Sequence, residues 1–293
     1  MGSVTPATTS TTAHETRLAA RVNTVLSTSG LAPSYIQANL IVLPSRFADP
    51  FRLLCHRNPV PCPLLASSAH PGDFSTLKSH LPNIPDAARF AHDLDLRTDA
   101  PRYMVYQDGA LVKSKVPDVF ADWTDDHVAF LIGCSYSFET ALTAAGLPPR
   151  HTLLSRVVPM YRTKVPLHPA GVFTGATMVV SMRPYRRQDV ETARTVTRAY
   201  EATHGEPVAW GWEALEKLGI DDINRPDWGD KSAAADGVEG LRIGDEQNVP
   251  VFWGCGVTPQ EAVMRAKLPG TVMGHAPGHM VVLDVKDEDV FNV

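Results

Sequence analysis

Cysteine, positive charge and long apolar runs are all scarce in this chain of 293 residues. Its four cysteines show no C-x2-C zinc spacing and are too few for a disulfide framework. No apolar stretch reaches the ~18–20 residues that a membrane-spanning helix needs. The net charge of −5 also excludes the basic surface typical of nucleic-acid binding. These absences predict a protein of a reducing compartment, cytoplasmic or alternatively mitochondrial, with neither membrane nor nucleic-acid partners.

Several nucleotide and hydrolase motifs are also missing. The chain has no G-x-x-x-x-G-K-[ST] phosphate loop, no G-x-G-x-x-G fingerprint, no G-x-S-x-G elbow and no H-E-x-x-H zinc pair. No required cofactor is therefore evident, although a divalent metal such as Mn2+ stays open. The expected partner is a small-molecule substrate, and an anionic one would need a local pocket because the overall charge is negative.

Proline, in contrast, is abundant, and its 24 residues predict much ordered loop. Amphipathic helices are predicted over residues 15–27 and 190–200, with a hairpin turn at Gln107-Asp108-Gly109. Four largely apolar runs are typical of strands buried on both faces of a parallel sheet. They span residues 128–132, 178–182, 249–253 and 280–285. The pattern predicts an α/β fold, preceded by a Thr/Ser-rich disordered segment at residues 1–16.

One local pattern occurs twice. Gly133-Cys134 and Gly254-Cys255 each follow an apolar strand and precede a predicted helix. In the second copy Thr258 is a natural helix N-cap, and Glu261 is placed to close a capping box. If both turns lie at the same end of a parallel sheet, they form the kind of crevice in which open α/β sheets bind ligands. The alternative is two ordinary tight turns.

Side chains beside these turns suit catalysis. Cys134 could act as a nucleophile, because a helix N-terminus lowers a thiol pKa, or it could be a small buried apolar residue. Cys255 has the same place in the second turn. Glu139 could serve as a general base, or it could be a first-turn carboxylate that the helix dipole favours.

Histidine and arginine supply further candidates. His275 and His279 flank a Pro-Gly turn and could transfer protons, hydrogen-bond a substrate or bind a metal, or only satisfy carbonyls of the turn. Arg183 ends an apolar strand, which suits bidentate capture of a substrate carboxylate or a salt bridge to an acidic neighbour. His204, before Gly205, is placed as a capping partner at a helix C-terminus.

Eight stretches of the chain carry a family resemblance. They are residues 37–40, 55–64, 130–139, 158–163, 178–184, 204–205, 249–260 and 275–280. In this order, and over nearly the whole chain, they resemble the D-glutamate cyclase family, whose members are also called hydro-lyases.

The resemblance implies a three-layer α/β lobe with a smaller two-layer α+β lobe inserted in it. The larger lobe is placed at residues 17–135 plus 205–293, and the smaller lobe at residues 136–204. The implied activity is that of a carbon–oxygen lyase of amino acid metabolism, which converts D-glutamate to 5-oxo-D-proline with loss of water. Alternatives are dehydration of another small hydroxy acid, or non-catalytic binding of a small carboxylate. A homo-oligomer stays open.

The cyclisation needs a carboxylate clamp, an oxyanion site, an acid and a base. Arg183 is the predicted clamp, and backbone N–H groups around Cys134-Ser135 and Cys255-Gly256 are the predicted oxyanion site. Acid and base are expected among Glu139, His275 and His279. Further substrate-binding candidates are Ser135, Ser137, Tyr161, Thr163, His204, Thr258 and Gln260.

One segment departs from the family pattern. Where the family reads His-Ile-Gly-Asp-Pro, this chain has Ala209-Trp210-Gly211-Trp212-Glu213. The chain thus loses a histidine and gains two indoles. If the segment contacts the substrate, the departure favours a larger or less polar one.

Overall fold

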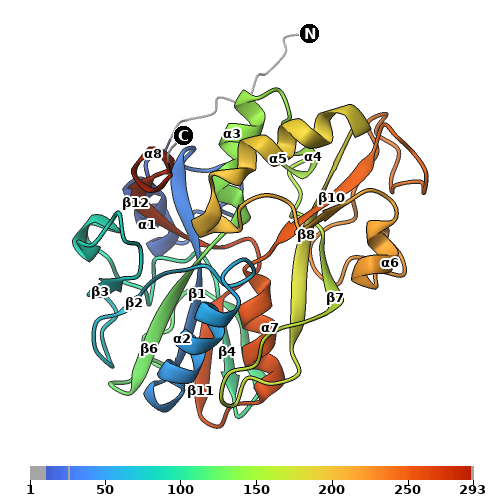
Figure 1. Cartoon of the computed structure of the whole chain (residues 1–293). Coiled ribbons are helices and arrows are strands. Elements are labelled where there is room, and N and C mark those ends of the chain that lie inside the picture. Colours follow the sequence, from blue (N-terminus) through green and yellow to red (C-terminus); the bar gives the residue numbers. More distant parts are fainter. Residues whose placement is uncertain (1–10, 26, 292–293) are drawn as a thin grey trace.

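Two antiparallel sheets lie side by side in the computed structural model, which describes residues 11–25 and 27–291 (Figure 1). The first sheet has the strand order β3-β2-β6-β1-β11-β4-β5, with β12 also paired to β1. Its strands are β1 (Tyr35–Pro44), β2 (Leu64–Ser68), β3 (Leu77–Ser79), β4 (Tyr103–Gln107), β5 (Ala110–Val116), β6 (His127–Gly133), β11 (Thr271–His275) and β12 (Val281–Lys286). The second sheet has the order β7-β8-β10-β9, with β7 (Met160–Pro166), β8 (Thr177–Tyr185), β9 (Ala209–Trp210) and β10 (Val249–Gly254).

Helices cover both sheets and fill the space between them. They are α1 (Ala13–Arg21), α2 (Ala48–Arg57), α3 (Glu139–Ala144), α4 (Arg150–Leu153), α5 (Val190–Arg198), α6 (Ala214–Leu218), α7 (Val257–Ala266) and α8 (Asp287–Val290). A 3-10 helix, Ser135–Phe138, leads from β6 into α3. The predicted α/β class is confirmed in the broad sense that helices and sheets are mixed.

The parallel arrangement expected from the apolar runs is wrong. Within the described ranges, neighbouring strands in each of the two sheets pair antiparallel. The runs in the first sheet are largely apolar because each of its two faces packs into a core. In β1, for example, Leu40 faces a core shared with α3 and α5, while Ile41 faces a core shared with α2 and α7.

The apolar runs themselves are strands, as predicted, and they lie in β6, β8, β10 and β12. The predicted hairpin joins β4 to β5, with Asp108 and Gly109 both at positive φ. Helix α5 lies within the predicted 190–200 segment. The first helix, in contrast, ends at Arg21 rather than at residue 27.

The predicted disorder at residues 1–16 is wrong for its last part. Helix α1 begins at Ala13, where Thr12 and Glu15 form a capping box that satisfies two free N–H groups. Residues 1–10 lie outside the described residues.

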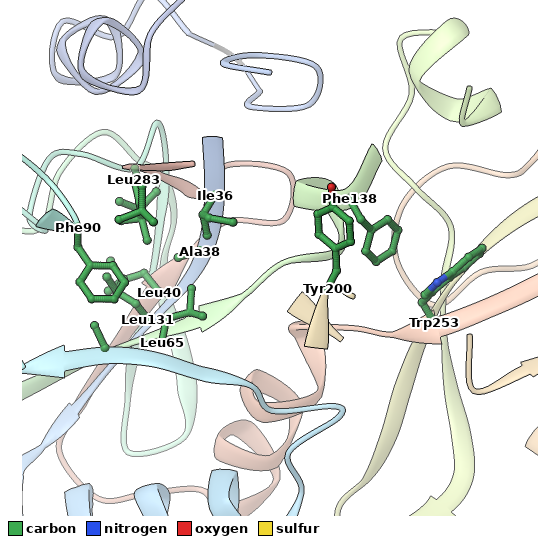
Figure 2. Packing of buried hydrophobic residues seen from close by; sticks show 14 of the residues in the cluster. Ile36, Ala38, Leu40, Leu65, Phe90, Leu131, Phe138, Tyr200, Trp253 and Leu283 are labelled. Atoms are coloured by element: carbon green, nitrogen blue, oxygen red, sulfur yellow. The ribbon is translucent and has the colours of Figure 1, made fainter. Parts of the chain in front are cut away.

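Each of the two main cores takes residues from both sheets, so the sheets do not form separate cores. Trp253 of β10 lies with Phe138 and Tyr200 on the side toward the second sheet, while aliphatic residues such as Leu131 and Leu283 gather beside the first (Figure 2). The second sheet also takes β9 and β10 from beyond residue 204. The smaller lobe expected at residues 136–204 therefore does not coincide with the second sheet, and the division into two lobes stays a prediction. No helix among the described residues is long and apolar enough to cross a membrane.

Candidate active site

The two Gly-Cys turns meet at a small inner pocket. Cys134 follows β6 of the first sheet and Cys255 follows β10 of the second, and both line a cavity of about 30 Å³. Both turns thus line one pocket, although it lies between two antiparallel sheets rather than at one end of a parallel sheet. That this pocket binds a ligand stays a prediction. Residues that start α7, Gly256 and Val257, complete one wall.

A larger outer cavity of about 200 Å³ adjoins the inner pocket, since Val257, His275 and Pro277 line both. Its walls are mainly apolar, with Ile41, Met104, Trp228, Val263, Met264, Val272 and Met273. Its polar groups come from Tyr106, Gln260, Glu261 and His275. A small ligand could therefore place a polar head in the inner pocket and its remainder in the outer cavity.

His275 occupies the junction of the two cavities, at the end of β11. Its Nδ1 lies 2.8 Å from the carbonyl oxygen of Ala276. Its Nε2 lies 2.9 Å from Oδ1 of Asn39 and 3.2 Å from Nε2 of Gln260. Burial lowers the pKa of His275 to about 4, although the carbonyl of Ala276 favours the protonated form. This histidine has the placement that a proton-transfer group needs.

Asn39 is the main support of His275, and the sequence analysis did not single it out. Its Nδ2 donates to the carbonyls of Ile132 and Gly133, at 3.3 and 3.1 Å, so the amide is held against β6. Gly256 packs directly on this amide, because a Cβ there would lie 1.9 Å from the Asn39 Nδ2. The available signal was a pair of amides, Gln37 and Asn39, inside an otherwise apolar buried strand.

The second histidine of the predicted pair does not share this site. The Nδ1 of His279 donates to the carbonyl of Pro277 at 2.7 Å, and burial lowers its pKa. His279 does not line either of the two cavities described. Of the two imidazoles, only that of His275 therefore faces these cavities, and that of His279 bonds a carbonyl of the turn.

Arg183 and Glu139 are bound to each other. Arg183 Nε donates to Oε1 of Glu139 at 3.0 Å, and a second donor, Nη2, also reaches this oxygen. His151 Nε2 lies 3.1 Å from the same oxygen. Burial opposes ionisation of Glu139, but His151 and Arg183 outweigh it and lower its pKa to about 2. The salt bridge that the sequence left open for Arg183 is thus the arrangement found.

The rest of the Arg183 guanidinium is also occupied. It donates to the hydroxyls of Ser181 and Ser135 at 3.1 Å each, and it lies between the rings of Phe138 and Trp253. The side chain is fully buried. Arg183 and Glu139 therefore hold the first turn in place, and Arg183 is not positioned as a carboxylate clamp. Glu139 also lines a separate cavity of about 380 Å³, but its Oε1 is taken up by Arg183 and His151.

The two turn cysteines line the inner pocket as thiols. Burial raises the pKa of Cys134 to about 12 and that of Cys255 to about 11. Both thiols therefore remain protonated at neutral pH. Neither cysteine has the lowered pKa of an activated nucleophile. The alternative reading of Cys134 as a small buried residue agrees with its exposure of 7%.

Four of the predicted substrate-binding side chains are occupied by backbone groups. Ser137 accepts from the N–H of Gln37, Tyr161 donates to the carbonyl of Ile223, Thr163 donates to that of Met178, and Thr258 bonds both backbone groups of Val179. The expected N-cap at Thr258 is wrong, because α7 already begins at Val257 and the hydroxyl extends the edge of β8 instead. Glu261 likewise does not close a capping box but pairs with Arg162 at 2.9 Å.

His204 is the cap that its sequence position predicts. It lies at φ +89° at the end of a 3-10 helix, Glu201–Thr203, and its Nδ1 donates to the carbonyl of Val60 at 2.8 Å. Burial lowers its pKa to about 4. Of the predicted substrate-binding side chains, Gln260 and Ser135 line the cavities described here.

The segment that departs from the family pattern, residues 209–213, lies away from the site. Trp210 packs beneath Arg194, and Trp212 donates to the carbonyl of Asp245 at 3.2 Å. Neither indole lines the inner pocket or the outer cavity. The segment therefore gives no reason to expect a different substrate.

Metal ligands do not converge in the described part of the chain. Within it, no group of three or more His, Cys, Asp or Glu side chains is arranged to hold an ion. A need for Mn2+ and the formation of a homo-oligomer stay predictions.

Comparisons with known proteins agree on one family. A family model described as D-glutamate cyclase matches residues 128–284. A "Putative hydro-lyase" of Schizosaccharomyces pombe is 44% identical over 88% of this chain and 79% of its own length. One of Bordetella pertussis is 48% identical over 93% of this chain and 89% of its own. The crystal structure of a nitrogen repressor-like protein from Methanococcus jannaschii covers 96% of this chain and 97% of its own, at 11% identity and a TM-score of 0.37, which supports no conclusion.

Proposed function

Because this chain belongs to the D-glutamate cyclase family and is a carbon–oxygen lyase, we propose that it converts D-glutamate to 5-oxo-D-proline with loss of water. The observation that carries the proposal is His275, held by Asn39 and Gln260 where the inner pocket meets the outer cavity.

The reaction is balanced by moving protons within the substrate. The ammonium nitrogen loses two protons, a C–N bond forms to the γ-carboxyl carbon, and one carboxyl oxygen leaves with both protons as water. An imidazole between the nitrogen and the oxygen can take one proton and return it. Neutral His275, with its pKa lowered by burial to about 4, is free to accept that proton near neutral pH.

The second contribution to the rate acceleration comes from binding the substrate in a folded-back conformation. The two cavities share Val257, His275 and Pro277 in their walls, and a ten-residue helix begins at Val257. N–H groups at such a start favour negative charge, which suits the oxyanion formed when the amine attacks. Holding amine and carboxyl carbon together lowers the entropic cost of ring closure.

The test is incubation of the purified chain with D-glutamate and with L-glutamate, followed by chiral chromatography for 5-oxoproline. Parallel samples contain Mn2+ or EDTA. We expect 5-oxo-D-proline from the D-isomer, and loss of product in His275→Gln but not in His279→Gln. A folded enzyme that yields no product from either isomer would contradict the proposal.

The outer cavity favours a second candidate. Its aliphatic, methionine and tryptophan walls suit an apolar substituent better than a second carboxylate. Such a site could dehydrate a small hydroxy acid, with His275 protonating the leaving hydroxyl. Alkene absorbance with a series of 2- and 3-hydroxy acids, measured beside the glutamate assay, separates the two reactions.

A further inference from the structure

Both ring nitrogens of His275 face oxygen acceptors. Nδ1 lies 2.8 Å from the Ala276 carbonyl, and Nε2 lies 2.9 Å from Oδ1 of Asn39. A neutral imidazole carries one N–H and can donate to only one of these oxygens, whereas an imidazolium donates to both. The hydrogen-bond partners therefore favour the charged form.

The Asn39 amide cannot turn to remove this demand. Its Nδ2 donates to the carbonyls of Ile132 and Gly133, and the reversed amide would place Oδ1 against two oxygens. Gly256 closes over the same amide with no Cβ. Gln260, by comparison, lies at the outer cavity and bonds only His275, so its amide can present either end.

Burial opposes the charge on His275, and no counter-ion nearby among the described residues offsets it. In the parts of the chain that the structure describes, no Lys or Arg and one carboxylate, Glu261, line the two cavities, and Glu261 is paired with Arg162. The thiols and phenols that line the two cavities are neutral near pH 7, since burial raises the pKa of Cys134, Cys255, Tyr106 and Tyr136.

On the loop side, the titratable groups named by their effect on the two histidines are basic rather than acidic. His279 acts on His275 and lowers its pKa, and Lys115 and Arg102 act in the same direction on His279. Tyr103, which pairs with His275 across β4 and β11, is neutral because burial raises its pKa well above the usual value. An entering anion would be the first negative charge to face this imidazole.

We propose that His275 takes up a proton when a carboxylate enters the inner pocket, and that Asn39 is the positioning residue that holds the resulting imidazolium. This rests on the site of the proposed function and deepens it. For a substrate that carries both groups, the proton taken up is the one that the ammonium releases, and it is then available to the leaving oxygen. Anion binding and proton binding must strengthen each other by the same factor.

The experiment follows the imidazole itself. NMR titration of His275 against pH is recorded with no ligand, with saturating acetate and with acetamide, which has nearly the same shape but no charge. His275→Gln assigns the resonance, and His80, at the far edge of the first sheet, is the internal reference. We expect acetate to raise the proton affinity of His275 about tenfold or more, one pKa unit, and acetamide not to.

Two substitutions at one position test the role of Asn39. Asn39→Leu removes the acceptor, so the acetate-induced shift should disappear. Asn39→Asp places a permanent charge beside the imidazole, so His275 should be protonated without acetate. An unchanged His275 titration in acetate, or an equal response to acetamide, would overturn the proposal, and a full shift in Asn39→Leu would remove Asn39 from it.

The glutamate assay is scored separately. If acetate shifts His275 but D-glutamate is not converted, the proton coupling stands and the proposed substrate is wrong. If D-glutamate is converted but no anion shifts His275, the coupling is wrong and the proposed function stands.

Discussion

The two Gly-Cys turns have the same local sequence pattern and opposite uses. The turn after β6 continues into a short 3-10 helix whose polar groups bind Arg183. The turn after β10 opens a ten-residue helix and faces His275 through Gly256 and Val257. Both line one pocket, yet the first is held by a buried ion pair and the second by an amide against a glycine. A local sequence pattern thus places a turn, while residues distant in the sequence decide what the turn does.

The largest expected effect is on the ion pair of the first turn. Arg183→Met leaves the buried Glu139 carboxylate with His151 as its remaining partner, and we expect a loss of about 3–5 kcal/mol in the free energy of unfolding. Urea denaturation measures it. The double variant Arg183→Met/Glu139→Gln should recover much of the loss, since no uncompensated charge remains. A single-variant loss below about 1 kcal/mol would mean that the pair does not hold the turn.

His275→Gln should act on catalysis rather than on stability. We expect kcat to fall about 10²–10⁴-fold, because a proton-transfer group is removed. The matched variant at the first turn, Ser135→Ala, should leave kcat within about tenfold, because Ser135 contacts Arg183. Steady-state kinetics on both, with denaturation curves, compare the turns. Equal effects on kcat would erase the distinction between them.

Alanine substitutions at the turn glycines should affect stability at the first turn and catalysis at the second. At Gly133 a Cβ would lie 2.0 Å from the backbone oxygen of Ala202, so we expect about 1–3 kcal/mol less stability. At Gly256 the Cβ would displace the Asn39 amide, so we expect about a hundredfold loss of kcat. Gly254→Ala, whose nearest contact is 3.1 Å, is the mild control.

Acid pH should destabilise the two turns in different windows. Glu139 has a pKa lowered from 4.5 to about 2, so its contribution to stability is complete above 4.5 and is lost as pH falls through 2. His275 has a pKa lowered from 6.5 to about 4, so its contribution is complete above 6.5 and is lost as pH falls through 4.

Denaturation at a series of pH values, in buffers without carboxylates, measures both windows. Glu139→Gln should flatten the lower window, and His275→Gln should flatten the upper one in part, because His204 also has a pKa lowered to about 4. An upper window unchanged by His275→Gln would show that this imidazole does not titrate there.

The smallest effect is expected from the thiols. With pKa values raised by burial to about 12 and about 11, Cys134 and Cys255 remain protonated at neutral pH. Cys134→Ala and Cys255→Ala should each keep kcat within about tenfold, because neither acts as a thiolate nucleophile. Loss of several orders of magnitude in either variant would restore a covalent role.

Much of the local structure could be predicted from the chain. Runs such as 128–132 and 249–253 are strands, Asp108-Gly109 makes the predicted hairpin turn, and His204 is a cap. The family assignment is confirmed by the family-model match and by the relatives at 44% and 48% identity. These features depend on neighbours within a few residues, where burial and turn geometry leave a clear pattern.

The misplaced roles have a common cause. Arg183 was expected to bind substrate, and Asn39 was missed, because the partner of each is remote in the sequence. Arg183 and Glu139 are 44 residues apart, and Asn39 and His275 are 236 apart. The apolar runs also suggested a parallel sheet, since a strand buried on both faces looks the same in either direction.

The sequence by itself determined which segments are apolar strands, where the two Gly-Cys turns occur and which family the chain belongs to. Only the tertiary structure decided that the strands pair antiparallel, that the turns come from two sheets and that Asn39 rather than Arg183 supports the site. The reason is physical. Hydrophobic periodicity and turn chemistry act over a few residues, whereas a buried polar group takes whichever partner the packing brings within about 3 Å.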